Sequence, residues 1–476
     1  MDIRRAPSLP VAGKTDNNVS FAIKHHSECA SRQLPANWIG VRADWRLYSE
    51  EPWEHLVSVS PAELRTHALV IGSTGSGKTN LLHQLIAQDI ARRHAIAGHD
   101  LRGDFLGTGV EQCAGRVDPS LVKILNLREK NRVFGFNPLS GSGEPDIRAL
   151  HTLDVIMETT DATGVQLLET MRNGLQLMAE TGQPLTELEN LFYDRSFRYQ
   201  CLERSTSKSV RTFWQQFDCL TQDRQRAMAP PVLNKISLLL STPTLRRILG
   251  HPKPIDLTQH LNTPGNVTLV SLAVDEHHAA GRMMGSLILS AICREVFARV
   301  EIPESQRVPL RLYVDEFQNF TSQDFETILA EGRRYKFSLV LANQSLVQLP
   351  PKLRSIILNN VGMKVIFRCG REDSATMSRD LFGDHRAYDF TELPVGYCVL
   401  WRRDLGAVEV EVNEPLIRDV GAQSADAKKF LEEVYRHAGS GVEESTVVDI
   451  SHSRATVPQH RPTRPHKISS SLEDWL

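Results

Sequence analysis

The residues with the clearest chemical purpose form a loop of the pattern GxxxxGK[ST], at positions 72 to 79. Its glycines let backbone N–H groups turn toward phosphate oxygens, because no Cβ stands in the way. Lys78 is expected to reach the β- and γ-phosphates, and the Thr79 hydroxyl to ligate a metal ion. An apolar run precedes the loop and a helical pattern follows it, which is the context that this motif requires. The loop therefore predicts a bound nucleoside triphosphate, ATP, with Mg²⁺.

The expected nucleotide contacts extend over the loop and one residue beyond it. The start of the following helix adds the positive end of its dipole. The residues expected to bind the cofactor are Gly72, Ser73, Thr74, Gly75, Ser76, Gly77, Lys78, Thr79 and Asn80.

Two adjacent acids follow a second apolar stretch, where Leu312–Val314 runs into Asp315 and Glu316. The carboxyl ends of strands line the ligand crevice of an open α/β sheet. Asp315 is therefore expected to hold the magnesium shell, and Glu316 to orient and deprotonate an attacking water. An acidic pair also follows an apolar strand by chance in many proteins, but the phosphate loop upstream favours the nucleotide role.

Two further residues fit the same chemistry. Gln344 follows the apolar run Leu339–Ala342 and is expected beside the γ-phosphate as a sensor, although an ordinary strand-to-loop turn would look the same. Arg333 lies in Glu331–Arg334, and a guanidinium that reaches the nucleotide of a neighbouring subunit would stabilise transition-state charge. A solvated face or a nucleic-acid contact is the alternative for Arg333.

Composition excludes several classes of protein. The chain has 476 residues, with 41% hydrophobic and 24% charged side chains, as in soluble globular proteins. A net charge of −2 gives no global attraction for nucleic acid, so any DNA contact needs locally clustered basic residues. The cysteines form no CxxC pair, which argues against a zinc ribbon. No apolar stretch approaches the roughly 18–20 residues that cross a bilayer, so we expect a cytoplasmic protein without direct membrane insertion.

Patterns along the chain predict five segments. Strands alternating with helices indicate a parallel, buried sheet, and apolar residues at helical spacing interrupt it. The segments are a β-rich N-terminal region with strands near 19–23 and 38–41 (1–60), the first part of an ATPase core (61–144), an all-helical insertion (145–257), the second part of the core (258–420), and a helix with a disordered tail (421–476).

The combination resembles the HerA/FtsK class of ring-forming motor ATPases, and within it HerA-type translocases and TraD/TraG-type conjugative coupling proteins. The segments that carry the resemblance are Ile71–Thr79, Tyr313–Phe320, Glu331–Phe337, Leu341–Ser345 and Asn359–Gly362. The resemblance implies an α/β fold: a RecA-like P-loop NTPase with a parallel sheet, an inserted all-helical domain and a small N-terminal β element.

The resemblance also implies a homohexamer that pumps DNA through a central pore with ATP. It assigns catalysis to Lys78, Glu316, Gln344 and a trans-acting Arg333, with Arg371 as a second, weaker arginine candidate. The sequence departs from the family at 97–104, where only Gly103-Asp104 matches the usual Asp-Pro-x-Gly-Asp-like turn, which leaves the role of Asp100 open. The transmembrane helices of most conjugative coupling proteins are not found, which favours a HerA-like motor.

We expect an ATP-driven hexameric DNA translocase. The alternative is a nucleotide-regulated hexameric scaffold that controls a partner effector, such as a nuclease or a relaxase-like protein. Glu316 argues against a pure scaffold, while the helical insertion and the C-terminal tail argue for some partner. The sequence does not separate conjugation, end processing and phage defence.

Overall fold

The computed structural model describes residues 38–42, 56–59, 63–160, 164–320, 323–384, 387–412 and 424–438. The strand expected near 19–23 and the tail beyond 438 lie outside these ranges. The described strands form one sheet of eleven, in the order β2-β1-β11-β10-β9-β3-β8-β7-β4-β6-β5. The α/β fold with a parallel sheet, which the alternation of strands and helices indicates, is confirmed.

The half of the sheet that contains β3 is parallel, and β3 lies between β9 and β8. Most of its strands are buried along their whole length, as expected for strands with helices on both faces. Its members, in spatial order, are β9 (Met363–Phe367), β3 (Ala68–Ile71), β8 (Phe337–Asn343), β7 (Leu310–Val314), β4 (Ala95–Asp100), β6 (Val267–Ser271) and β5 (Val122–Asn126).

An antiparallel extension continues the sheet beyond β9. It consists of β10 (Tyr397–Arg402), β11 (Gly406–Glu411), β1 (Trp38–Arg42) and β2 (Leu56–Ser58). The N-terminal β element predicted at 38–41 is therefore present, and it is built into the main sheet through pairing of β1 with β11. Gly40 permits this close approach, since a Cβ there would lie 2.3 Å from the carbonyl oxygen of Glu411.

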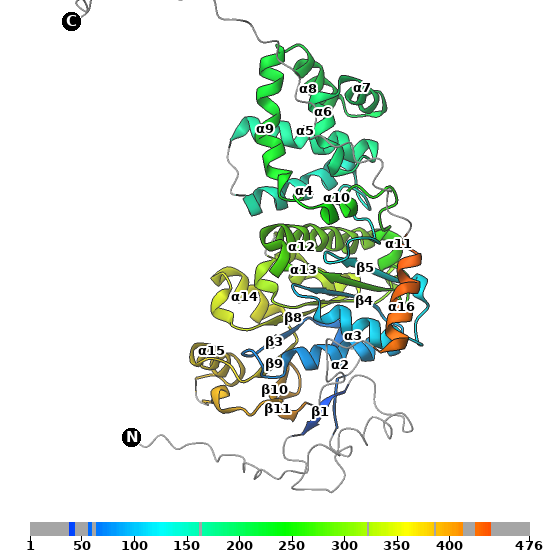
Figure 1. Cartoon of the computed structure of the whole chain (residues 1–476). Coiled ribbons are helices and arrows are strands. Elements are labelled where there is room, and N and C mark those ends of the chain that lie inside the picture. The colour runs from blue at the N-terminus through cyan, green and yellow to red at the C-terminus, as the bar shows by residue number, and fades with distance from the viewer. Residues whose placement is uncertain are drawn as a thin grey trace, which may run out of the picture. The chain divides into compact units, whose positions relative to one another are not determined.

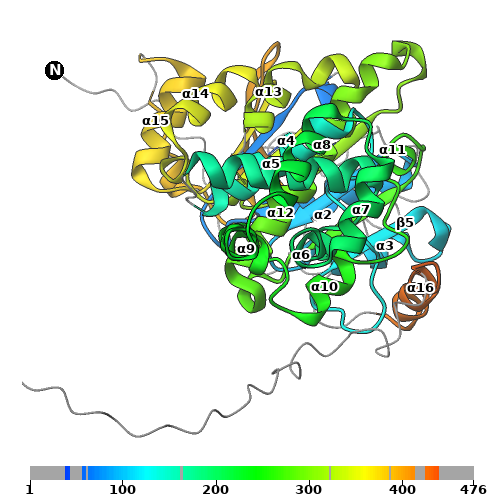
Figure 2. The same ribbon diagram turned by 90° about the horizontal axis from the view of Figure 1, so that it is seen from above.

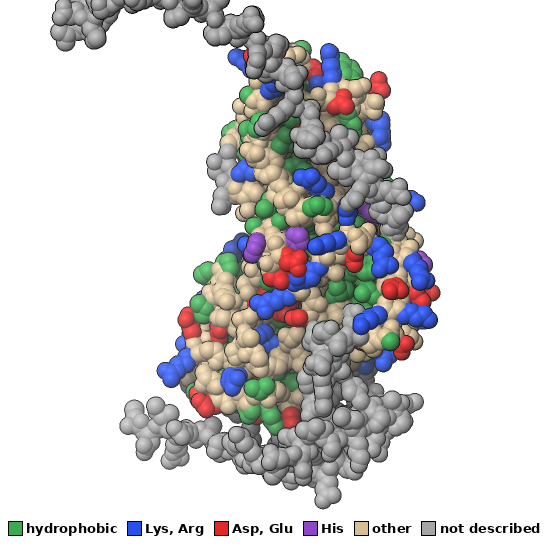
Figure 3. Space-filling view, viewed as in Figure 1, with side chains coloured by type: hydrophobic (Ala, Val, Ile, Leu, Met, Phe, Trp, Pro, Cys, Tyr) green, Lys and Arg blue, Asp and Glu red, His purple; other side chains and the backbone are tan. Residues whose placement is uncertain are grey.

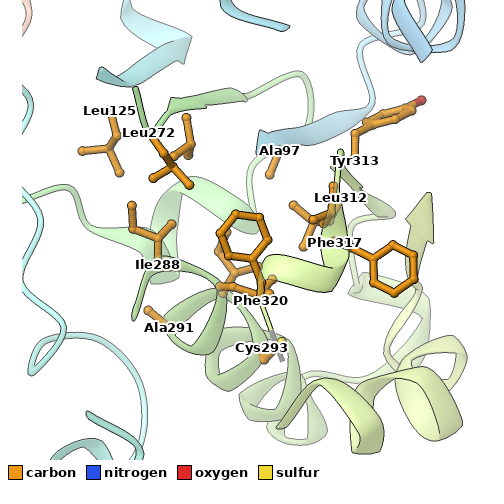
Figure 4. Close-up of a cluster of buried hydrophobic side chains, with 14 of the residues drawn as sticks. Ala97, Leu125, Leu272, Ile288, Ala291, Cys293, Leu312, Tyr313, Phe317 and Phe320 are labelled. Carbon is orange, nitrogen blue, oxygen red and sulfur yellow. The ribbon is translucent and has the colours of Figure 1, made fainter. Parts of the chain in front are cut away.

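Helices cover both faces of the parallel half (Figure 1). α2 (Lys78–Ala91) and α3 (Asp104–Cys113) lie on one face, and α12 (Val274–Phe297) and α13 (Gln323–Glu331) lie on the other. Figure 4 shows Phe320 in the same buried cluster as Ile288 and Ala291 of α12. The remaining helices of the core are α14 (Pro351–Asn360), α15 (Arg371–Phe382) and α16 (Ala425–Arg436), the last packing along α3.

A group of helices between β5 and β6 joins the sheet layer where α4 packs on α12 (Figure 2), and its buried side chains belong to the same hydrophobic core as those of the sheet. The centre of this group is Trp214, fully buried, with Phe192 and Phe217 edge-on to it at centroid distances of 5.5 and 5.2 Å. The helices are α4 (Pro145–Thr160), α5 (Val165–Thr181), α6 (Leu188–Tyr193), α7 (Arg195–Arg204), α8 (Lys208–Asp218), α9 (Gln222–Ser237), α10 (Pro243–Leu249) and α11 (Leu257–Leu261). None of the described helices is both long and apolar enough to span a bilayer.

A buried ion pair ties the helix after the phosphate loop to the strand that carries the acids. Asp89 on α2 is 0% exposed, and its carboxylate accepts from Arg311 at 2.6 Å and from the Tyr313 hydroxyl at 2.5 Å, both on β7. Burial alone would raise the pKa of Asp89, but Arg311, His94 and Tyr313 lower it below its usual range. The carboxylate is therefore charged at neutral pH, and α2 and β7 are held as one block.

Replacing Asp89 by alanine should lower the free energy of unfolding by about 3–5 kcal/mol, because Arg311 would stay buried without its counter-charge. Urea unfolding followed by circular dichroism measures the loss. The matched control is Glu326→Ala, which removes the partner of Lys352, a residue whose side chain is 75% exposed. That control should cost less than about 1 kcal/mol, and equal losses in the two variants would contradict the role given to the buried pair.

Candidate nucleotide-binding site

The phosphate loop joins β3 to α2 and is shaped by its glycines. Gly75 has φ 73° and Gly77 has φ 118°, values that favour residues without a Cβ. A Cβ on Gly77 would also lie 3.0 Å from the Phe367 ring. Lys78, only 6% exposed, donates to the carbonyl oxygens of Gly72 at 2.5 Å and Ser73 at 3.2 Å. The loop is therefore a preformed cradle with its ammonium group folded against it.

Neighbouring strands brace this loop. Ser73 donates from its backbone N–H, at 2.7 Å, and from its hydroxyl, at 3.1 Å, to the carbonyl oxygen of Arg368 just beyond β9. Gly396, just before β10, donates from its N–H to the carbonyl oxygen of Ser76 at 3.0 Å. The antiparallel extension thus supports the loop from the side opposite the acids.

The parallel arrangement brings the predicted polar residues to the loop. β8 lies between β3 and β7, with Ile71 level with Asn343 and Leu341 level with Val314. Gln344, which follows β8, and Asp315, which follows β7, consequently emerge at the same edge of the sheet as the loop. Asn80 lies in the first turn of α2, directly behind it.

Asp315 is electrostatically coupled to Lys78. Burial and then the nearby Glu316 charge raise the pKa of Asp315 to about 6, while Lys78 acts in the opposite direction. Burial lowers the pKa of Lys78, and the charges of Asp315 and Glu316 partly offset this effect. The site therefore holds a partly buried acid whose ionised form needs a nearby cation.

These residues fit a Mg²⁺ ion that is shared with phosphates. The Thr79 hydroxyl and the Asp315 carboxylate are hard oxygen donors, the type that Mg²⁺ prefers. Over the described ranges, no group of three or more His, Cys, Asp or Glu side chains could hold a metal. Mg²⁺ at this site would take its other ligands from phosphates and water, as it usually does where protein ligands are few.

Glu316 is held by hydrogen bonds to both of its carboxylate oxygens. Its backbone adopts φ 50° and ψ 46°, a left-handed conformation that is uncommon outside glycine. Gln344 donates from Nε2 to Glu316 Oε1 at 2.5 Å and accepts from the Thr74 hydroxyl at 3.3 Å. A continuous hydrogen-bonded line therefore runs from the phosphate loop through Gln344 to Glu316.

Gln318 contacts the other carboxylate oxygen of Glu316. The sequence alone predicted no role for this residue. Its Nε2 donates to Glu316 Oε2 at 2.7 Å. The only signal in the sequence was an amide two residues after the acid, which by itself predicts nothing.

The turn at Asp100, whose role the sequence left open, shapes this edge of the sheet. The Asp100 carboxylate accepts from the backbone N–H groups of Arg102, Gly103 and Phe105, and so closes the turn into α3. Burial raises the pKa of Asp100 to about 7 against these hydrogen bonds. Asp104, at the start of α3, lies close enough to Asp315 to raise its pKa as well.

Arg333 lies at the opposite edge of the sheet from the loop. It belongs to the 3₁₀ turn Gly332–Tyr335 that precedes β8, and β8 spans seven residues. At about 3.3 Å per residue, roughly 20 Å separates the two edges, which exceeds the reach of an arginine side chain. Arg333 therefore cannot serve the phosphate loop of its own chain.

The turn that carries Arg333 is nonetheless rigidly braced. Arg307 donates to the carbonyl oxygen of Arg334 at 2.6 Å, and the buried Arg299 donates to that of Tyr335 at 3.2 Å. The Arg333 side chain is exposed. Arg371, the second arginine candidate, begins α15 just after β9 and is at the loop edge of its own chain.

Two family models match parts of the chain. Residues 309–392 match the model described as the TraM recognition site of TraD and TraG. Residues 55–112 match the model described as the type IV secretion-system coupling protein DNA-binding domain. No curated protein is a significant match in sequence.

Solved structures give matches across most of the chain. The plasmid coupling protein TrwB in complex with ADP and Mg²⁺ aligns with TM-score 0.56 and 17% identity, covering 83% of this chain and 98% of TrwB. The unbound bacterial conjugative coupling protein TrwBΔN70 gives TM-score 0.55 and 15% identity over 84% and 92%. VirB4 of Thermoanaerobacter pseudethanolicus gives TM-score 0.54 and 12% identity over 80% and 97%.

The resemblance to TraD/TraG-type coupling proteins that the motifs indicate is confirmed by the two family models. The likeness to TrwB and VirB4 confirms the fold with its inserted helical domain. The two matched segments contain the phosphate loop and the acids, which are the parts that sequence reasoning relied on.

Lys78→Ala should abolish detectable binding of a fluorescent ATP analogue, because the ammonium group that faces the phosphates is removed. Fluorescence anisotropy measures the affinity. Lys429→Ala, which removes an exposed lysine on α16, is the matched control and should bind as the wild type does. Normal affinity in Lys78→Ala would remove the phosphate-loop assignment.

Proposed function

We propose that this chain is an ATP-driven DNA translocase that works as a homohexamer and hydrolyses ATP at the interfaces between subunits. The observation that carries the proposal is the separation of Arg333 from the phosphate loop of its own chain. The loop, the two acids and the sensor lie at one edge of the sheet, and the exposed, braced arginine lies at the other. The site is therefore complete only when two subunits meet.

The comparisons with known proteins support the ligand and the DNA. TrwB has been solved with ADP and Mg²⁺, which supports ATP and Mg²⁺ as cofactors here. One family model is described as a DNA-binding domain, and the other as a site that recognises TraM. These descriptions support DNA and a protein as partners, and conjugative DNA transfer as the setting.

The chain's own residues divide the chemistry of hydrolysis. Lys78 and the loop N–H groups, from Gly72 to Asn80, bind and orient the triphosphate. Thr79 and Asp315 would hold Mg²⁺, which neutralises charge on the β- and γ-phosphate oxygens when bound. Glu316 takes the proton of the attacking water, and Gln344 contacts the terminal phosphate.

Arg333 of a neighbouring subunit would stabilise the charge that develops as the γ-phosphate leaves. This contact forms only while two subunits are closed around ATP, so hydrolysis and subunit movement are coupled. The buried ion pair between α2 and β7 contributes to this coupling, because the loop and the acids then move as one block.

DNA contacts have to be local, because the net charge is only −2. On the face in Figure 3, basic and acidic side chains are interspersed rather than gathered by sign. The proposal therefore assigns DNA binding to loops that line the pore of the ring.

DNA should accelerate ATP hydrolysis several-fold, and the stimulation should weaken steeply as salt rises, because counterion release drives binding. A phosphate-release assay with and without DNA, at several salt concentrations, measures both effects. Indifference to DNA together with stimulation by a protein partner would contradict the motor. It would favour instead a nucleotide-regulated scaffold for an effector such as a nuclease, an alternative supported by the TraM-recognition match.

Arg333→Ala should be inactive alone, and mixing it with Lys78→Ala should restore activity. In a random equal mixture about a quarter of the interfaces of a cyclic ring would combine an intact loop with an intact arginine. Steady-state hydrolysis across mixing ratios measures the rescue. Arg334→Ala, which changes a neighbouring arginine that is 76% exposed, is the matched control and should stay active. Absence of activity at every ratio would contradict a shared site.

A further inference from the structure

The hydrogen bonds around Glu316 present a conflict if Gln344 is the sensor. Gln344 donates one Nε2 hydrogen to Glu316 and accepts from the Thr74 hydroxyl through Oε1, so both ends of its amide already take part in the hydrogen-bonded line to Glu316. A sensor whose amide turns toward the terminal phosphate moves the same Nε2 group that holds Glu316. Without another donor, the carboxylate would lose its alignment at the moment when it is needed.

Gln318 is placed to supply that other donor. It lies in the 3₁₀ turn Phe317–Asn319, directly after the acid. Phe317 is 0% exposed and Phe320 is 1% exposed, and Figure 4 shows both directed into the apolar interior. A Cβ on Gly285 of α12 would lie 2.5 Å from the Phe320 ring, so this anchor fits closely. Gln318 is therefore carried on a turn that is fixed at both ends.

The backbone of Glu316 is fixed by the same turn. Its N–H donates to Asp315 Oδ1 at 2.9 Å, and its carbonyl oxygen accepts from the Asn319 side chain at 2.9 Å. These bonds hold the left-handed conformation of Glu316 in place. They leave only the side-chain torsions of Glu316 to be set, and Gln318 Nε2 is the donor from this turn that reaches the carboxylate.

The orientation of the Gln318 amide leaves one of its atoms in an unfavourable environment, which supports a specific role for the other. Its Oε1 is buried and has no hydrogen-bond partner among the described residues. Leaving a buried acceptor unpaired costs roughly 1–3 kcal/mol in general. A glutamine retained only for packing gains nothing from this arrangement, whereas a donor directed at a carboxylate makes one of the stronger hydrogen bonds in proteins.

We propose that Gln318 is a positioning residue that holds the Glu316 carboxylate in its catalytic orientation, so that Gln344 can move to the terminal phosphate without releasing it. This inference rests on the proposed hydrolytic function of the same site. Gln318 does not touch the nucleotide in this account, and it acts only through Glu316.

The test uses Gln318→Met in the full chain, since methionine has similar length and no donor. Turnover should fall about 10- to 100-fold, the loss expected for a hydrogen bond to a charged group. The KM for ATP, the affinity for a fluorescent ATP analogue and the melting temperature should stay at wild-type values. Gln348→Met, which changes an exposed glutamine beyond Gln344, is the matched control and should turn over normally.

Gln318→Glu separates donation from shape. Glutamate matches glutamine in size but repels the carboxylate of Glu316, so its turnover should fall below that of Gln318→Met. Turnover of Gln318→Met within twofold of the wild type would overturn the inference. So would loss of analogue binding or of the melting transition in that variant, because Gln318 would then support the fold and not the carboxylate.

Glu316→Gln distinguishes failure of this inference from failure of the proposed function. If Glu316→Gln binds the analogue but does not hydrolyse ATP, while Gln318→Met is unaffected, only the role of Gln318 is lost. If Glu316→Gln turns over like the wild type, the hydrolytic site itself is wrongly assigned.

Discussion

A parallel sheet presents the carboxyl ends of its strands at one edge and their amino ends at the other, and this polarity decides where each predicted site residue lies. The phosphate loop, Asp315 and Gln344 all follow strands, so they meet at one edge. Arg333 precedes β8, so it is held at the other edge. No side-chain rearrangement removes a separation of roughly 20 Å that the backbone itself imposes. In the proposed ring, the Arg333 guanidinium is therefore supplied by a second subunit.

Buried charge gives the loop edge its rigidity. Asp89 and Arg311 bind α2 to β7 across the core, and Tyr313 adds a hydrogen bond to the same carboxylate. The loop and the acids are the continuations of these two elements, so their spacing is set by packing and not by a mobile segment. At the opposite edge, Arg299 and Arg307 use backbone carbonyl groups to brace the arginine turn. Both halves of the proposed interface are therefore formed before subunits meet.

The features that could be predicted from the sequence are those encoded in short, contiguous patterns. Three such features are recognisable within short segments of the chain. They are the phosphate loop, the apolar strand that ends in Asp315 and Glu316, and the helical spacing between β5 and β6. The pairing of β1 with β11 could not be foreseen, because it joins segments more than 350 residues apart. The same holds for the bond between Asp89 and Arg311, and for the three backbone donors that collect on Asp100. Gln318 could not be predicted for another reason. Its amide reaches the Glu316 carboxylate because the Glu316 backbone is left-handed, and no local propensity indicates that conformation.

The central claim is that ATP is cleaved at an interface between chains. Its most direct test is the turnover per chain measured over a wide range of protein concentration, with the oligomeric mass determined by analytical ultracentrifugation at each point. If ATP is cleaved between chains, turnover per chain rises as monomers give way to rings and is negligible where monomers alone are present. Turnover that stays at its full value in a purely monomeric sample would contradict it.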